Sequence, residues 1–295
     1  MTSNPLGIHA GIWGFDWSET AAERAISGAA AAGYSLIEIP AVVVDPETLR
    51  YTRELLVKHD MTASVSLALD LASDINSVDA TRVAAGEKRL VDAVDFARGI
   101  GASFVGGVVF SAMTRYWSKP TADARAHSLA VLRRVGAYAA THNITLGIEY
   151  VNRYESNLLN TAEQTRQFII ELGLENAVLH LDTFHAHVEE ASLARAVLES
   201  ARVLGYVHAS ESHRGRLGTG SVNWDEFFFA LSRVAYAGPI VVETFSPDVI
   251  SEAQAIEIGL WETQWSDPQE IAEASFVFLT QQLSTRAALS GAVSH

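Results

Sequence analysis

Four side chains that can bind a metal ion or carry a proton end short apolar runs in the second half of the chain. Each run has the length and composition of a buried parallel strand. The runs, each with its polar residue last, are Thr145–Glu149, Ala177–Asp182, Leu204–His208 and Pro239–Glu243. Three carboxylates and one imidazole held at one edge of a sheet are unfavourable without a cation between them. The pattern therefore predicts a divalent metal site.

The ligand types indicate which metal and which chemistry such a site would support. Two glutamates, an aspartate and a histidine form an oxygen-rich set that suits Mn²⁺, Mg²⁺ or Co²⁺. Four ligands leave two octahedral positions for a ketose carbonyl oxygen and the neighbouring hydroxyl. The second carboxylate oxygens of Glu149 and Glu243 could then remove a proton from one face of a carbon and return it to the other. That reaction is epimerisation, whereas proton return to the adjacent atom would be aldose–ketose isomerisation.

Residues that follow these strand ends are candidates for substrate contacts. Arg214 could polarise a substrate oxygen or could be a surface arginine, and Glu155 permits the same two interpretations. Of two nearby histidines, we expect His185 to face the site and His187 to lie on the surface. Glu38 ends an earlier apolar run without an evident partner and is interpreted as structural. The shape of the pocket is expected to depend on Trp13, Phe110 and Met113.

Short β-like runs alternate with longer helix-like segments along the whole chain. The eight predicted strands are Gly7–Gly14, Leu36–Ala41, Ala63–Leu69, Phe104–Phe110, Leu146–Val151, Ala177–Asp182, Gly205–Ala209 and Ile240–Phe245. Eight βα units close a barrel, and no linker divides the chain, so we expect one (β/α)8 TIM barrel domain over residues 1–295. Because the carboxyl ends of the strands meet at one face of such a barrel, the four polar strand ends are expected to converge.

The composition excludes several classes of protein. With 48% hydrophobic and 19% charged residues, the chain can bury a sizeable core. A formal charge of −14 argues against a nucleic-acid or anionic-membrane partner. Cysteine is absent, and neither a secretory signal nor a membrane-spanning run is evident, so we expect a cytoplasmic location. None of the lysines ends a strand, which argues against a Schiff-base aldolase; they are Lys58, Lys88 and Lys119.

Three segments together resemble the D-tagatose 3-epimerase family, which includes D-allulose (D-psicose) and L-ribulose 3-epimerases among the xylose-isomerase-like barrels. The segments are Gly147–Glu155, Leu181–Glu190 and His208–Gly215. The resemblance implies a Mn²⁺-type ion held by Glu149, Asp182, His208 and Glu243. It also implies that the two glutamates are the acid–base pair, and that the ketose is gripped around its first two oxygens by Glu155, His185 and Arg214. Members of the family are usually homodimers or homotetramers.

Two positions depart from the family pattern. Glu262 stands where relatives often have arginine, and Met113 stands where some have tryptophan. Neither position is among the expected metal ligands. The departures therefore concern substrate preference and subunit contacts.

The resulting hypothesis is a metal-dependent ketose 3-epimerase that acts through an enediolate. Its free substrates would be pairs such as D-fructose and D-allulose, D-tagatose and D-sorbose, or L-ribulose and L-xylulose. An alternative is an isomerase or epimerase of a phosphorylated sugar or an inosose, since Arg214 and Arg216 lie in a glycine-containing loop. An alternative from another class is a sugar-binding protein without catalytic activity.

Overall fold

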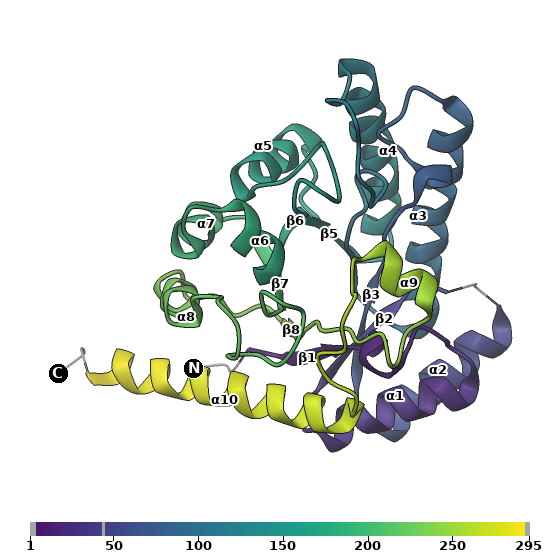
Figure 1. Ribbon diagram of the computed structural model, residues 1–295. Helices are drawn as coiled ribbons and strands as arrows, with labels where there is room; N and C mark the ends of the chain where they lie inside the picture. The colour runs from purple at the N-terminus through teal and green to yellow at the C-terminus, as the bar shows by residue number, and fades with distance from the viewer. Residues whose placement is uncertain (1–3, 43–44, 293–295) are drawn as a thin grey trace.

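Eight parallel strands form a closed barrel surrounded by helices (Figure 1). The computed structural model describes residues 4–42 and 45–292. The strands are β1 (Leu6–His9), β2 (Leu36–Pro40), β3 (Thr62–Ser66), β4 (Phe104–Gly106), β5 (Thr145–Glu149), β6 (Ala177–Asp182), β7 (Leu204–Ala209) and β8 (Ile240–Val242). Gly7 of β1 pairs with Val241 of β8, so the sheet has no free edge. The predicted (β/α)8 barrel is confirmed.

Helices follow each strand and surround the barrel, and the last two both come after β8 (Figure 1). They are α1 (Glu19–Ala31), α2 (Pro46–Lys58), α3 (Ala80–Ile100), α4 (Ala122–Ala140), α5 (Ala162–Leu172), α6 (Thr183–Glu189), α7 (Leu193–Ser200), α8 (Trp224–Arg233), α9 (Glu252–Glu257) and α10 (Pro268–Ala292). Short 3-10 helices follow β1 and β3, at Ala10–Trp13 and Leu71–Ser73. Within the described ranges, none of the helices combines the length and apolar character needed to cross a membrane.

The inside of the barrel changes from apolar to polar along its axis. Leu36, Phe104, Tyr206 and Val241 form a small apolar cluster separate from the main core. The rings of Phe104 and Tyr206 stack with their centroids 4.0 Å apart. Because side chains two residues apart on a strand point to the same side, His208 lies above Tyr206 on that interior face. The apolar layer therefore supports a polar layer nearer the carboxyl ends of the strands.

Gly107 ends β4 earlier than the sequence predicts. The apolar run Phe104–Phe110 predicts a strand through Phe110, but the chain leaves the sheet after Gly106 because Gly107 has a φ of 111°. Its carbonyl oxygen accepts a hydrogen bond of 3.1 Å from the backbone N–H of Glu149. The turn at Gly107 therefore holds the end of β5.

We expect Gly107→Ala to lower the free energy of unfolding by at least about 3 kcal/mol, because the left-handed backbone alone costs roughly 1–2 kcal/mol and a further overlap is added. A Cβ at this position would lie 2.3 Å from the carbonyl oxygen of Leu67. Gly101→Ala is a matched control, since Gly101 has a φ of 82° but nothing within 4 Å of an added Cβ. Denaturant unfolding measures both variants; equal losses would contradict the explanation.

Candidate active site

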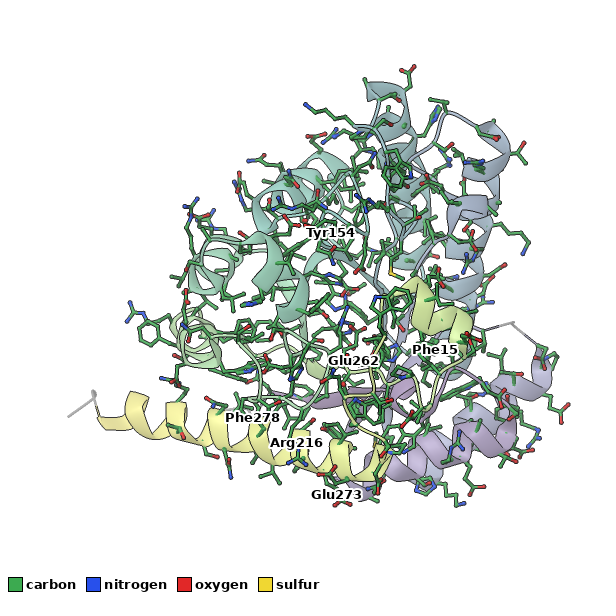
Figure 2. The ribbon with its side chains drawn as sticks, viewed as in Figure 1. Phe15, Tyr154, Arg216, Glu262, Glu273 and Phe278 are labelled. Atoms are coloured by element: carbon green, nitrogen blue, oxygen red, sulfur yellow. The ribbon has the colours of Figure 1, made fainter. Side chains whose placement is uncertain are left out.

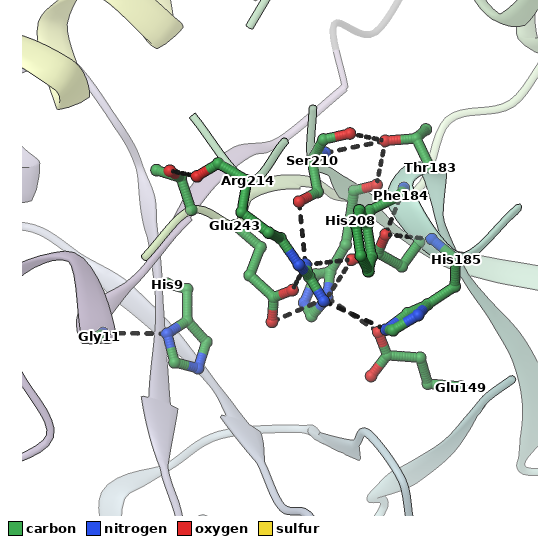
Figure 3. Close-up of polar contacts among 12 residues, drawn as sticks. His9, Gly11, Glu149, Thr183, Phe184, His185, His208, Ser210, Arg214 and Glu243 are labelled. Atoms are coloured by element: carbon green, nitrogen blue, oxygen red, sulfur yellow. Dashed lines mark hydrogen bonds and ion pairs between the residues drawn. The ribbon is translucent and has the colours of Figure 1, made fainter. Parts of the chain in front are cut away.

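The four polar strand ends converge at one end of the barrel, and Figure 3 shows Glu149, His208 and Glu243 among them. Glu149, Asp182 and His208 lie at or next to the last residues of β5, β6 and β7, and Glu243 directly follows β8. One donor atom from each of the four lies within 4.8 Å of the others, and all four residues are buried. His208 Nδ1 is 3.2 Å from Glu149 Oε1 and 3.4 Å from Glu243 Oε1. We call these four residues the ligand cluster.

The two carboxylate oxygens of Asp182 have different roles: one caps a helix and the other faces the site. Oδ1 accepts the backbone N–H groups of Phe184 and His185 and so caps the N-terminus of α6. Oδ2 faces the other residues of the ligand cluster and lies 3.7 Å from His208 Nδ1. The helix cap therefore fixes the direction in which the second oxygen points.

The charges of the ligand cluster fit a divalent cation. Although burial opposes ionisation of Glu243, His208 and Arg214 hold its pKa below the usual value. Burial, followed by the charges of Glu243 and Asp182, raises the pKa of Glu149 to about 8 against the opposing effect of His208. Burial alone lowers the pKa of His208, but the surrounding carboxylates outweigh it and hold that pKa well above the usual value. Without a metal, protons therefore supply part of the positive charge that a cation would bring.

A second group of predicted residues borders the ligand cluster. The guanidinium of Arg214 donates to Asp182 Oδ2 at 3.2 Å, to Ser210 Oγ at 2.9 Å and to Glu243. Its Nη2 is 3.2 Å from His185 Nε2, and Phe184 covers its face with the ring centroid 4.0 Å away. Arg214 is thus fixed on several sides and is not a mobile surface cation.

His185 and Glu155 extend this group towards the cavity. Burial lowers the pKa of His185 to about 3, so its imidazole is neutral. Glu155 Oε2 lies 3.9 Å from His185 Nε2, and its other oxygen accepts a hydrogen bond of 2.8 Å from Asn152. A neutral ring, a carboxyl group and a guanidinium side by side can bind hydroxyl and carbonyl oxygens of one small ligand. His187, as predicted, lies away from the ligand cluster; its Nε2 is 3.1 Å from the exposed Ser221.

A cavity of about 360 Å³ opens above the ligand cluster. Polar groups from β5 to β8 line one part of it, and Phe15, Phe245 and Met113 line another. The rings of Phe15 and Phe245 stack with centroids 5.7 Å apart. Gln254 and Glu257 of α9 also contribute to the wall, so the segment between β8 and α10 covers part of the opening. Mixed polar and apolar walls of this size suit a small organic ligand.

Trp13 and Phe110 do not line this cavity, which differs from the expectation that they shape the pocket. His9 Nδ1 accepts the N–H of Gly11, and the chain then forms a 3-10 helix through Trp13. The indole consequently packs against Gly28 of α1. Phe110 is fully buried in the core. Met113 is the member of this predicted set that lies in the wall.

Three buried residues near the ligand cluster were not identified from the sequence as part of the site: His9, Glu38 and His180. Glu38, interpreted as a structural residue without a partner, lies 3.0 Å and 3.1 Å through its two oxygens from His208 Nε2. The ring of His180 meets His208 edge to face with centroids 4.1 Å apart, and neither of its nitrogens has a hydrogen-bond partner. All three lie on strands. Glu38 is visible in the sequence as a strand end, but its partner is not, and His9 falls inside the predicted strand Gly7–Gly14, so the strand-end pattern does not single it out.

Comparison with known proteins gives one family and close relatives. Residues 26–275 match the family described as xylose isomerase-like TIM barrel. An L-ribulose 3-epimerase of Methylomonas sp. (strain DH-1) is 39% identical over 278 residues, which cover 94% of this chain and 96% of the relative. A ketose 3-epimerase of Arthrobacter globiformis is 37% identical over 281 residues, covering 95% and 96% respectively.

A solved structure agrees with these matches. The crystal structure of a D-allulose 3-epimerase from Methylomonas sp. in complex with D-allulose superposes with a TM-score of 0.91 at 38% identity. The match covers 96% of this chain and 98% of that one.

Proposed function

The chain belongs to the xylose isomerase-like TIM barrel family, and we propose that it is a divalent-metal-dependent 3-epimerase of free ketoses. The observation that carries the proposal is the ligand cluster, in which two glutamates share one site with an aspartate and a histidine. The names of the close relatives, L-ribulose 3-epimerase and ketose 3-epimerase, support the same reaction. The D-allulose bound to a relative of similar fold supports a six-carbon ketose as substrate, and the name L-ribulose 3-epimerase supports a five-carbon ketose.

In this proposal Glu149 and Glu243 move the proton at C3. Their carboxyl oxygens lie within 4.8 Å of each other in the ligand cluster and approach it from β5 and from the end of β8. One glutamate removes the proton from one face of the ketose and the other returns a proton to the opposite face. A bound Mn²⁺, or Co²⁺ or Mg²⁺, would supply positive charge where the enediolate oxygens become negative.

The neighbouring group holds the ketose during this transfer. Arg214 is fixed by Asp182, Glu243 and Ser210, so its remaining N–H groups meet the substrate without a further loss of side-chain entropy. The neutral ring of His185 and the carboxyl group of Glu155 bind hydroxyl groups near C1 and C2. Phe15 and Phe245 cover apolar C–H surfaces of the sugar.

A phosphorylated substrate is less well supported. Arg216, one of the two arginines that motivated that alternative, is about half exposed, forms an ion pair with Glu270 of α10 and does not line the cavity (Figure 2). Arg214 is already engaged with two carboxylates of the ligand cluster. Arg89 does line the cavity, but it is paired with Asp70 at 2.8 Å. An excess of negative charge around the ligand cluster would also repel a phosphate.

A substrate panel tests this proposal. Purified protein with Mn²⁺ is incubated with L-ribulose, D-allulose, D-fructose, D-tagatose and the 5- or 6-phosphates of the matching ketoses, and the products are separated by chromatography. We expect C3 epimers from free ketoses and no conversion of the phosphates. Conversion of phosphates alone would favour the alternative substrate class.

The homo-oligomer implied by the family stays a prediction, which light scattering after gel filtration would check.

Metal affinity is expected to fall as the pH is lowered. Because the pKa of Glu149 in the metal-free protein is raised to about 8, a proton competes with the metal below that pH. We expect the Kd for Mn²⁺ to weaken by about tenfold per pH unit for each proton displaced, between about pH 8.5 and about pH 6.5. Calorimetric titration in buffers of different protonation enthalpy measures both the Kd and the protons released. A Kd independent of pH would contradict the assigned protonation.

The same raised pKa has an opposite effect on the stability of the metal-free protein. Between the usual pKa of 4.5 and about 8, folded Glu149 keeps a proton that the unfolded chain releases. The contribution of Glu149 to the free energy of unfolding therefore decreases as the pH rises through this window. Bound metal is expected to remove this decrease, because it replaces the proton.

A further inference from the structure

We propose that Glu38 is a positioning residue that directs His208 towards the metal. The inference rests on the proposed metal-dependent function. Glu38 lies on β2, across the barrel from His208 on β7, and is completely inaccessible to solvent. It is not a member of the ligand cluster.

The contacts of Glu38 show which atoms it holds. Both of its oxygens face Nε2 of His208, at 3.0 Å and 3.1 Å, while Nδ1 of the same ring faces the carboxylates of the ligand cluster. The hydroxyl of Tyr206 donates to Glu38 Oε2 at 2.6 Å. The same hydroxyl lies 2.6 Å from Ser64 Oγ, which is therefore the donor to it. Glu38 thus accepts hydrogen bonds from two sides and is held in the polar layer of the barrel.

This arrangement selects one tautomer of His208. A carboxylate that accepts from Nε2 keeps the proton on that nitrogen, so the lone pair of a neutral ring is left on Nδ1. Nδ1 is the nitrogen that points into the ligand cluster. A carboxylate behind an imidazole ligand also makes the ring more basic and fixes its plane. Glu38 therefore fixes the ring so that Nδ1 faces the cation once the proton on that nitrogen has been displaced.

The surrounding residues make this orientation depend on Glu38. The ring of His180 packs edge to face against His208 but has no hydrogen-bonding contact with it. His9 Nε2 lies 3.8 Å from Glu38 Oε1, beyond hydrogen-bonding distance, and is 3.1 Å from Ser66 Oγ instead. Among the described hydrogen bonds, those of His208 Nε2 go to Glu38.

Two substitutions separate the charge of Glu38 from its shape. Glu38→Gln keeps an oxygen that can accept from Nε2 but removes the negative charge, and Glu38→Ala removes both. We expect the Kd for Mn²⁺ to weaken by about tenfold in Glu38→Gln and by up to about 100-fold in Glu38→Ala. Electron paramagnetic resonance of free Mn²⁺ during titration measures the Kd on purified protein, and circular dichroism confirms that each variant is folded.

Tyr206→Phe is the matched control. It removes a buried hydrogen bond to Glu38 but leaves the carboxylate against His208. We expect its Kd for Mn²⁺ to stay within about threefold of the wild-type value, although its stability falls. A loss in Tyr206→Phe as large as in Glu38→Ala would show that general disturbance of the barrel interior explains the effect.

Kinetics give a second readout that a merely structural role would not change. The described hydrogen bonds and ion pairs of Glu38 go to Tyr206, His208 and His9, which are not proposed to bind the ketose. Saturating Mn²⁺ is therefore expected to restore most of kcat in Glu38→Gln. The Mn²⁺ concentration for half-activation should rise in parallel with the Kd. Wild-type affinity in both Glu38 variants would overturn the positioning role alone. Absence of Mn²⁺, Co²⁺ and Mg²⁺ binding by the wild-type protein would overturn the metal-dependent function and this inference with it.

Discussion

Glu149→Gln and Glu243→Gln are each expected to lower kcat for epimerisation by about 10²–10⁴-fold while metal remains bound. Glutamine has nearly the shape of glutamate and retains an oxygen that can coordinate a cation, but it cannot carry the proton. Because the two glutamates approach the ligand cluster from β5 and from the end of β8, neither can replace the other. Initial rates with a free ketose and metal analysis of the same samples measure the effect.

Isotope exchange makes this prediction more specific. If each glutamate serves one face of C3, each variant should lose washout of the C3 proton from one epimer and keep residual washout from the other. Glu54→Gln, on the exposed surface of α2, is a control that should behave as wild type. Full epimerisation by both active-site variants with metal bound would show that the paired-acid mechanism is wrong.

Removal of the metal is expected to lower activity by about 10³-fold or more, and addition of Mn²⁺ or Co²⁺ should restore it. Lewis-acid stabilisation of a developing oxyanion contributes several kcal/mol, and about 1.4 kcal/mol corresponds to a tenfold change in rate. Chelation would also leave Arg214 and His208 as the ion-pair partners of the buried carboxylates of Asp182 and Glu243.

The measurement combines activity with metal content after dialysis against a chelator. Thermal unfolding of the same samples should show a higher Tm after Mn²⁺ is added, because a ligand that binds only the folded state stabilises it. Full activity in protein shown to contain no metal would contradict the proposed function. Restoration by Mg²⁺ alone would retain metal dependence but change the proposed ion.

Much of this site could be predicted because the change from an apolar run to a polar side chain is visible in the sequence at four strands. Each of the four apolar runs in the second half of the chain ends in a charged or imidazole side chain, and parallel strands in a barrel must bring such ends to one face. The structure places Glu149, Asp182, His208 and Glu243 together for that reason. Glu38 also ends an apolar run, but its partners Tyr206 and His208 lie on β7, and the sequence alone does not show which strands face each other across the barrel.

Residues in the connections could not be placed in the same way. Trp13 follows β1 closely enough to suggest a pocket residue, yet a single hydrogen bond from Gly11 to His9 starts a 3-10 helix that turns the indole towards α1. The positive φ of Gly107 likewise ends β4 before Phe110. Such local turns depend on one or two backbone angles and leave no periodic pattern in the sequence.

The most direct test of the proposed reaction follows solvent deuterium into the sugar. Purified protein, Mn²⁺ and a free ketose such as L-ribulose or D-allulose are incubated in D₂O, and NMR reads the label at each carbon. We predict deuterium at C3 of the sugar together with formation of the C3 epimer. Deuterium at C1 with an aldose product, or formation of the C3 epimer without any deuterium, would contradict proton transfer at C3 by Glu149 and Glu243.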